Sequence, residues 1–271
     1  MSALGSDARA AAPRVPDRRR TFGYRVDVVA FLVRTELATR HRGSVLGWLW
    51  ALTPPLLQLI ATYFLFTRVI PLAIPDYPVF LLTGILAWTW FARSLGDGVV
   101  SLEQRRELVR RPGFSSALIP IAAVLVALVD YVLALPVLLI AVGLTTGLDA
   151  TALLLPLLLL VQLTYCVGLA LVVAPLQVYA RDVRQLVGLL VTVGFWLTPV
   201  FYSQRQIPSE LQWLYDVNPM AHLIAAQRQV LLAGELPSAT RVGLVAVVGI
   251  GALVLGAAVF HRCRNTVPER L

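Results

Sequence analysis

The chain has 271 residues, of which 58% are hydrophobic and 14% are charged, and its formal net charge is +8. A soluble domain has about a quarter of its residues charged, so this composition excludes an ordinary soluble protein and indicates a membrane protein. The positive balance needs no nucleic-acid partner, because basic residues gathered on one side of a bilayer give the same sum.

All 23 basic residues are arginines, which is typical of a high-GC bacterial genome. A phosphate-binding loop of the GxxxxGK[ST] type requires a lysine, so this chain cannot hydrolyse ATP by that route. The two Cys and three His lie far apart in the sequence, which predicts neither a disulfide framework nor a metal site. Since no catalytic motif is present, we expect a protein that is not an enzyme and has no cofactor of its own.

The N-terminal part predicts two segments that precede the membrane. Residues 1–20, rich in Ala, Arg and Pro, predict a disordered cytoplasmic tail. In residues 21–44 apolar side chains are interspersed with Arg and Glu, which is typical of an amphipathic helix in a membrane interface. Such a helix is either an ordinary anchor or a moving part, and the pattern does not distinguish the two.

The main body, residues 45–262, is predicted to be an all-α integral membrane domain, followed by a cytoplasmic tail at 263–271. A helix crosses the hydrocarbon layer in about 20 apolar residues. Proline occurs inside the predicted spans, and membrane helices tolerate it. Six stretches qualify as spans, at about 47–70, 78–98, 117–144, 151–178, 186–203 and 240–260.

The distribution of arginine predicts the orientation. Nine Arg precede the first span, five lie at 93–111, two lie between the fourth and fifth spans and three follow the sixth, which makes nineteen on one face. The other four, Arg68, Arg205, Arg228 and Arg241, belong to the opposite face. Because cytoplasmic loops carry the excess of basic residues, both termini are predicted to be cytoplasmic, in a multi-pass protein of the bacterial plasma membrane.

The stretch SLEQRRELVRRPG, residues 101–113, carries six charges within nine positions between two apolar spans. Glu103–Arg106 and Glu107–Arg110 are spaced i,i+3 and Glu107–Arg111 is spaced i,i+4, which predicts ion pairs on a short helix ended by Pro-Gly. The alternative is a solvated loop whose arginines fix the topology. Its acidic residues favour the helix slightly, since orientation requires no Glu.

Ionisable residues within predicted spans are candidates for a functional role, because charge is costly there. Arg93 and Asp97 are four residues apart, which predicts a structural pair. Asp130 has no partner nearby in the sequence, so either a hydrogen bond to a neighbouring helix or a position facing a lumen is expected.

Aromatic residues gather near the predicted span ends, as in an interfacial belt. For Trp88, Trp90, Phe195 and Trp196 a second interpretation is open, in which flat rings line a path for sugars. On the outer side, residues 220–233 predict a helix too short and too polar to span, which is compatible with a re-entrant segment.

Several of these stretches together resemble one family. They are RHRGSVLGWLWALTPPLLQL at 40–59, RDVR at 181–184, FWLTPVFY at 195–202 and Asn218-Pro219. In combination they resemble the permeases of ABC exporters for lipid-linked polysaccharides, O-antigen and teichoic acids, and the likeness covers nearly the whole chain from about residue 25. His41 and Thr53 depart from the Tyr and Asn usual in that family.

The resemblance implies a homodimer of six-helix subunits, paired with two copies of a separate ATPase that holds ATP and Mg. It implies that residues 21–44 form a gate helix and that 220–233 form an outer re-entrant gate. It assigns coupling to the ATPase to Glu103, Arg105, Arg106, Glu107, Arg110 and Arg111, and contact with the lipid diphosphate to Arg40, His41 and Arg42. It also favours the sugar path along Trp88, Trp90, Phe195 and Trp196.

The predicted cargo is a polyprenyl-diphosphate-linked polysaccharide of O-antigen or cell-wall galactan type, with teichoic acid also open. The high-GC composition favours galactan. The first alternative is a permease for drugs or small lipids in the same superfamily. The second is a membrane enzyme acting on lipid phosphates, which the lack of a catalytic motif disfavours.

Overall fold

The computed structural model describes residues 22–40, 52–69, 72, 74–263 and 266–270. Within these ranges every regular element is helical. The elements in chain order are α1 (Phe22–Arg40), α2 (Thr53–Phe64), η3 (Leu65–Val69), α3 (Tyr77–Gln104), α4 (Arg106–Val109), α5 (Leu118–Thr145), η4 (Ala150–Leu154), α6 (Leu155–Tyr179), α7 (Asp182–Leu197), η5 (Gln204–Gln206), η6 (Ser209–Leu211), α8 (Gln212–Val217), α9 (Pro219–Arg228), η7 (Gln229–Ala233), α10 (Ala239–Cys263) and α11 (Val267–Arg270).

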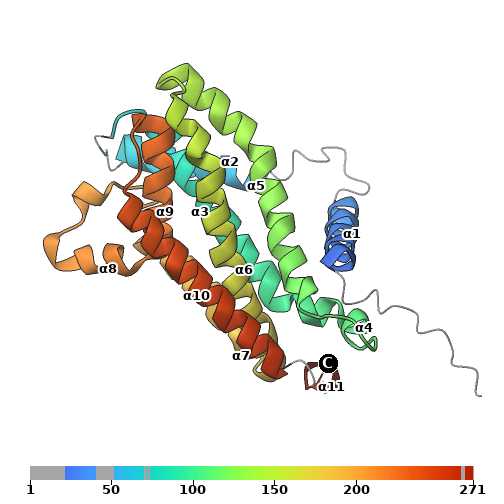
Figure 1. Cartoon of the computed structure of the whole chain (residues 1–271). Coiled ribbons are helices and arrows are strands. Elements are labelled where there is room, and N and C mark those ends of the chain that lie inside the picture. The colour runs from blue at the N-terminus through green and yellow to red at the C-terminus, as the bar shows by residue number, and fades with distance from the viewer. Residues whose placement is uncertain (1–21, 41–51, 70–71, 73, 264–265, 271) are drawn as a thin grey trace, which may run out of the picture.

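The bundle is built around α3, which packs against α2, α5, α6, α7 and α9, while α10 lies along α6 (Figure 1). In the most apolar window of α3, 72% of the residues are buried, against 17% in α10. The short helices α4 and α11 lie at one end of the bundle, together with the end of α10 (Figure 1). We call this the α4 end.

Among the described residues, four helical segments are long and apolar enough to cross a membrane, namely Tyr77–Gln104, Leu118–Thr145, Ala150–Tyr179 and Ala239–Cys263. They match four of the six predicted spans. The other two predicted spans contain shorter helices, α2 with the π-helical turn η3, and α7. Residues 47–51 of the first predicted span lie outside the described residues.

The fifth predicted span ends earlier than expected. It was predicted to reach residue 203, but α7 ends at Leu197 and Thr198 is extended, with φ −88° and ψ 138°. A residue before proline disfavours the helical region, so Pro199 explains the boundary. Five of the seven other prolines of the predicted spans occupy the first turns of α2, α3, α5 and α6, where a missing N–H costs nothing. Pro136 and Pro175 lie inside α5 and α6.

Glycines let α6 and α10 approach backbone to backbone. A Cβ added to Gly168 would lie 2.5 Å from the backbone nitrogen of Leu253 and 2.6 Å from the carbonyl carbon of Ala252. A Cβ on Gly256 would lie 2.6 Å from the carbonyl oxygen of Gly168. Small residues at helix crossings are typical of membrane proteins, where close packing replaces the hydrophobic effect.

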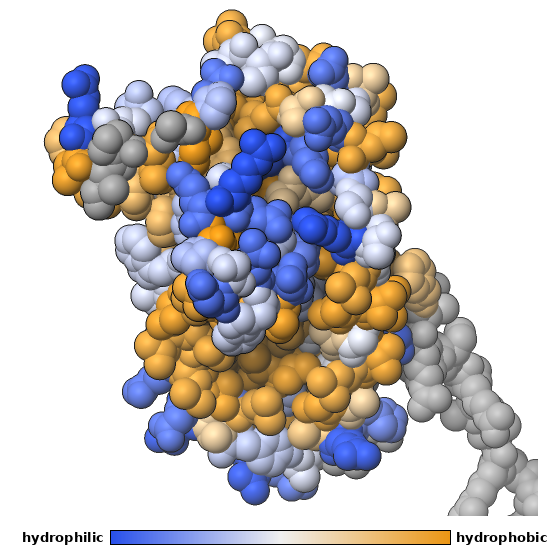
Figure 2. All heavy atoms as spheres, turned by 90° about the vertical axis from the view of Figure 1, so that its left-hand side faces the viewer, coloured by the Kyte–Doolittle hydropathy of each residue, from blue (hydrophilic) through white to orange (hydrophobic). Residues whose placement is uncertain are grey.

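Apolar side chains cover much of the surface. Figure 2 shows a broad apolar band on one face, with hydrophilic side chains below it and a hydrophilic zone above it. Large exposed hydrophobic residues are concentrated on α7 and α10, among them Leu190, Trp196, Val247 and Val254. Monomeric soluble proteins rarely expose apolar patches of this extent, so the surface agrees with a bilayer as the solvent.

Candidate functional site

The charged stretch at 101–113 is organised differently from the prediction. α3 continues to Gln104, the chain turns at Arg105, and α4 is a single turn that ends before Pro112 and Gly113, whose φ is +76°. Among the described residues, none of the three predicted ion pairs of this stretch forms.

Two of its charges are instead held by other helices. Glu103 accepts a hydrogen bond from Nε2 of Gln177 on α6 at 3.2 Å. Arg105 pairs with Glu36 of α1 at 2.7 Å. Partners in distant helices compete successfully for these side chains, because exposed pairs along one helix contribute a few tenths of a kcal/mol. The other four charged residues of the predicted coupling surface, Arg106, Glu107, Arg110 and Arg111, are exposed.

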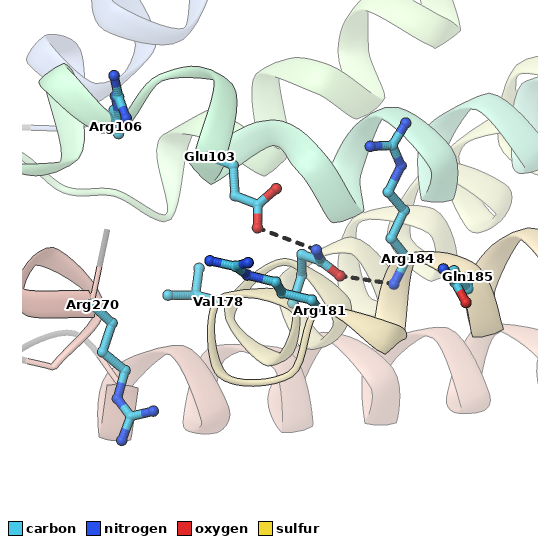
Figure 3. A pocket seen from close by; sticks show the side chains of 8 residues that line it. Glu103, Arg106, Val178, Arg181, Arg184, Gln185 and Arg270 are labelled. Carbon is cyan, nitrogen blue, oxygen red and sulfur yellow. Dashed lines mark hydrogen bonds between the residues drawn. The ribbon is translucent and has the colours of Figure 1, made fainter.

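An open hollow of about 690 Å³ lies at the α4 end (Figure 3). Its lining includes Arg106, Arg181, Arg184 and Arg270, which come from α4, the α6–α7 turn, α7 and α11. The side chain of Gln177 links Glu103 to the start of α7, because its Oε1 also accepts the backbone N–H of Arg184 at 2.8 Å. The fold thus gathers four arginines from three separate parts of the sequence on one basic surface.

A cluster of six charged residues joins α1 to α3 and α5. We call it the α1 cluster; it consists of Glu36, Arg40, Arg93, Asp97, Arg105 and Asp130. Arg40 pairs with Asp97 at 2.7 Å, with Asp130 at 3.4 Å and with Glu36 at 3.4 Å. Asp130, 6% exposed, also pairs with Arg93 at 2.9 Å. Three positive and three negative side chains therefore balance one another in a partly buried place.

The α1 cluster corrects one prediction and decides another. Among the described residues no ion pair joins Arg93 to Asp97, because each pairs with a different helix. Asp130 binds side chains of neighbouring helices, as the first of its two alternatives predicted. These partners could not be identified from the sequence, since Arg40 and Asp130 are 90 residues apart.

Of the three residues predicted to contact a lipid diphosphate, the described part of the chain contains Arg40; His41 and Arg42 lie outside it. Burial by itself lowers the pKa of the Arg40 guanidinium, but the hydrogen bond and charge of Asp97, with the charges of Asp130 and Glu36, more than offset this. The pKa of Arg40 is consequently raised, so the residue is a permanent cation that already has carboxylate partners.

The four aromatic residues predicted for a sugar path separate into two groups. The Trp88 and Phe195 ring centroids are 6.2 Å apart, and those of Phe195 and Trp196 are 5.5 Å apart. Trp90 lies in another part of the core, 1% exposed, with its ring centroid 5.2 Å from that of Tyr131. Three of the rings are therefore contiguous, and the fourth packs against α5.

Arg228, at the end of α9, forms a site that the sequence interpretation missed. Nη1 donates to the carbonyl oxygen of Pro199 at 2.7 Å, and Nη2 donates to those of Val200 at 2.5 Å and Phe80 at 3.1 Å. The guanidinium also lies 3.4 Å from the ring centroid of Phe80. A Cβ on Gly84 would lie 2.5 Å from Nη2, so glycine at this position leaves room for the arginine.

The start of α9 is tied to the same loop. The side chain of Asn218 accepts from the backbone N–H of Met220 at 3.0 Å and donates to Oγ1 of Thr198 at 2.8 Å. This capping explains the Asn218-Pro219 pair in local terms. Asn218 at the start of α9 and Arg228 at its end therefore both bind the loop 198–200.

A chain of buried amides, also missed, crosses the centre of the bundle. Gln227 of α9 donates to Gln162 of α6 at 2.9 Å, and Gln162 donates to the carbonyl oxygen of Ala87 at 2.9 Å. The hydroxyl of Tyr131 donates to Gln227 at 3.3 Å. Polar residues inside apolar runs are costly unless paired, and this was the signal that could have identified Gln162.

A family model described as "ABC-2 type transporter" matches residues 28–232. The chain is 32% identical over 257 residues to an O-antigen export system permease protein, RfbA, of Myxococcus xanthus, covering 93% of this chain and 98% of that protein. It is 28% identical over 252 residues to an RfbA of Klebsiella pneumoniae, covering 92% and 96%. It is 24% identical over 245 residues to the polysialic acid transport protein KpsM of Escherichia coli, covering 88% and 93%.

Proposed function

The chain belongs to the family of ABC-2 type transporters, and from this premise we propose that it is the membrane permease of an exporter for a cell-surface polysaccharide. The predicted resemblance to ABC exporter permeases is confirmed, and the chain is a transport subunit, not an enzyme. The observation that carries the proposal is the 32% identity to an O-antigen export permease across 98% of that protein. Membership also implies a partner ATPase, which agrees with the absence of Lys from the chain.

The finer features of the proposal are a homodimer, six spans per subunit and a polyprenyl-diphosphate-linked cargo of O-antigen or galactan type. In this arrangement α2 with η3, and α7, are the two short spans, and the exposed apolar side of α7 faces lipid or the second copy. The relatives are named for O-antigen and polysialic acid, which are both glycans. The cargo of drugs or small lipids is therefore not favoured.

We place the α4 end in the cytoplasm, where two copies of the ATPase, with ATP and Mg, bind. The arginine distribution supports this placement, as does the gathering of Arg106, Arg181, Arg184 and Arg270 around one hollow. Exposed Arg106, Glu107, Arg110 and Arg111 then form the coupling surface. Glu103 and Arg105 transmit movement of α4 to α6 and α1, because they bind Gln177 and Glu36.

The gate in this proposal is α1 with its charged cluster. A diphosphate brings oxygens that suit the guanidinium fork, so it competes with Asp97 and Asp130 for Arg40. Displacement of these carboxylates loosens α1 from α3 and α5 and opens the entry for the lipid head. His41 and Arg42 are the further candidate ligands, and the contiguous rings of Trp88, Phe195 and Trp196 are the candidate sugar contacts.

Charge reversal of the coupling surface tests this proposal. The double variant Glu107→Arg with Arg110→Glu exchanges two exposed charges that form no ion pair among the described residues. The tagged variant is co-expressed with the ATPase encoded beside it and pulled down. We expect the amount of retained ATPase to fall about tenfold or more, because mismatched charges across an interface cost several kcal/mol. The measurement is the ratio of ATPase to permease in the eluate.

The matched control reverses Arg205 and Glu210, an exposed pair of charges in the segment between α7 and α8. This control should retain the ATPase like the wild type. Equal retention by both double variants would show that 106–111 is a solvated loop. Failure of the wild type itself to retain any ATPase would contradict the exporter assignment.

A further inference from the structure

A second cavity at the α4 end combines a basic rim with an apolar floor. It has a volume of about 540 Å³ and lies among the start of α1, the turn before α5, α6 and the end of α10. Its volume is within the range of ordinary ligand sites. The cavity is distinct from the hollow beside Glu103, with which it shares none of its lining residues.

The cavity is lined by four polar residues. They are Arg25, three residues after the start of α1; His261, two residues before the end of α10; and Ser115 and Ser116, just before α5. In the described part of the chain the side chains of these four residues make no hydrogen bond or ion pair. Arg25, Ser115 and His261 are exposed, whereas Ser116 is 7% exposed, so the hydroxyl of Ser116 is available to a ligand from within the cavity.

Among the apolar residues of the same cavity, Leu171 and Phe260 are buried and Ile121 is half-buried. Ile121 is one turn into α5, and Leu171 lies eight residues before the end of α6. Phe260 of α10 and Leu171 are buried in the core cluster that also contains Leu32 of α1. The polarity thus changes from the end of the helices to their interior.

This gradient matches the depth profile of a bilayer. α5, α6 and α10 all belong to candidate spans, so their ends at the α4 end lie where the hydrocarbon layer meets the headgroups. Arginine near such a boundary attracts anionic lipid. No carboxylate is among the residues that line the cavity, so nothing in the described lining neutralises Arg25.

We propose that this cavity is a binding site for an anionic membrane phospholipid. The headgroup phosphate accepts hydrogen bonds from Arg25, Ser116 and His261, and one acyl chain lies against Ile121, Leu171 and Phe260. A lipid bound in this way joins α1 to α5, α6 and α10. It therefore anchors the first helix independently of the α1 cluster and of the exported cargo.

Lipid retention tests the proposal. The purified permease with its ATPase is equilibrated with vesicles of equal amounts of phosphatidylglycerol and phosphatidylcholine that carry the same acyl chains. After re-extraction the retained lipids are quantified by mass spectrometry. We expect phosphatidylglycerol to be enriched about tenfold, the factor that corresponds to one charge-assisted hydrogen bond.

The variants separate the two halves of the site. Arg25→Gln with His261→Gln should remove the enrichment, while Arg34→Gln, an exposed arginine of the same helix outside the cavity, should keep it. Ile121→Trp fills the floor without changing a charge and should also reduce the retained phosphatidylglycerol. The elution volume and melting temperature of each variant show whether it is folded.

Three results would overturn the proposal. The first is equal retention of both phospholipids by the wild type. The second is full competition by millimolar inorganic phosphate, which would indicate a site for small anions. The third is retention of added polyprenyl diphosphate where phosphatidylglycerol is not retained, which would assign the cavity to the cargo.

Discussion

Arg228→Met should lower the stability of the permease by about 2–4 kcal/mol and abolish export. The substitution leaves the carbonyl oxygens of Pro199 and Val200 without their donors, and a buried polar group left unpaired costs about 1–3 kcal/mol. The carbonyl of Phe80 lies within α3 and loses less, because a helical partner remains available to it. Removing the buried cation relieves some desolvation cost, so the net loss is smaller than the sum of the lost hydrogen bonds.

Arg228→Lys and Arg205→Met make the result interpretable. Lysine keeps the charge but offers its donors from a single nitrogen, so it cannot reproduce the fork that reaches Pro199, Val200 and Phe80, and an intermediate loss is expected. Arg205 is exposed on the same side of the bundle, and its replacement by methionine should leave the melting temperature unchanged. An Arg228→Met protein that melts and exports like the wild type would show that loop 198–200 needs no such support.

The second large effect is expected for Asp130→Asn, which keeps the shape of the side chain and removes its charge. Arg93 and Arg40 then lose a common anion in a partly buried place. Breaking a fully buried pair costs about 3–5 kcal/mol. The two arginines are 34% and 26% exposed, so solvent reduces this, and we expect a loss of about 2 kcal/mol together with weakened attachment of α1.

A double-mutant cycle isolates this pair. Arg93→Gln combined with Asp130→Asn removes both charges, and the double variant should be more stable than the sum of the single losses predicts. Asp27→Asn, an exposed change on α1, is the matched control. Melting temperature in detergent and the rate of proteolysis within α1 are the measurements. Strictly additive losses would mean that the 2.9 Å contact contributes nothing to holding the cluster together.

The sequence predicted the helices well, because their signal is local. Long apolar runs require backbone hydrogen bonds within each segment, and a helix occurs in each of the six predicted stretches. The boundaries were less accurate: α3 runs to Gln104, beyond the predicted end at 98, and the error at α7 came from giving apolar content more weight than Pro199. The helix at 106–109 was also shorter than predicted, since α3 takes up residues 101–104.

Charge partners were predicted poorly, because they depend on how distant helices pack. Glu103 and Arg93 both had plausible partners three or four residues away, yet each bound another helix. Arg105, which had none at that spacing, binds Glu36 of α1. Asp97 and Arg40 are 57 residues apart. Arg228 was counted as an outer-loop charge, although its partners are backbone carbonyls, for which a sequence carries no residue-specific signal. Gln162 and Gln227 carried a detectable signal, since each is a polar residue near apolar runs.

The central claim, that this chain exports a polysaccharide, is tested most directly by comparing glycan on the two sides of the membrane. In glycan-producing cells that lack the chain, we expect loss of the surface polysaccharide and accumulation of lipid-linked glycan inside. Wild-type chain should restore the surface glycan, and the Glu107→Arg, Arg110→Glu variant should not. Unchanged surface glycan in cells without the chain, with no internal accumulation, would contradict the account.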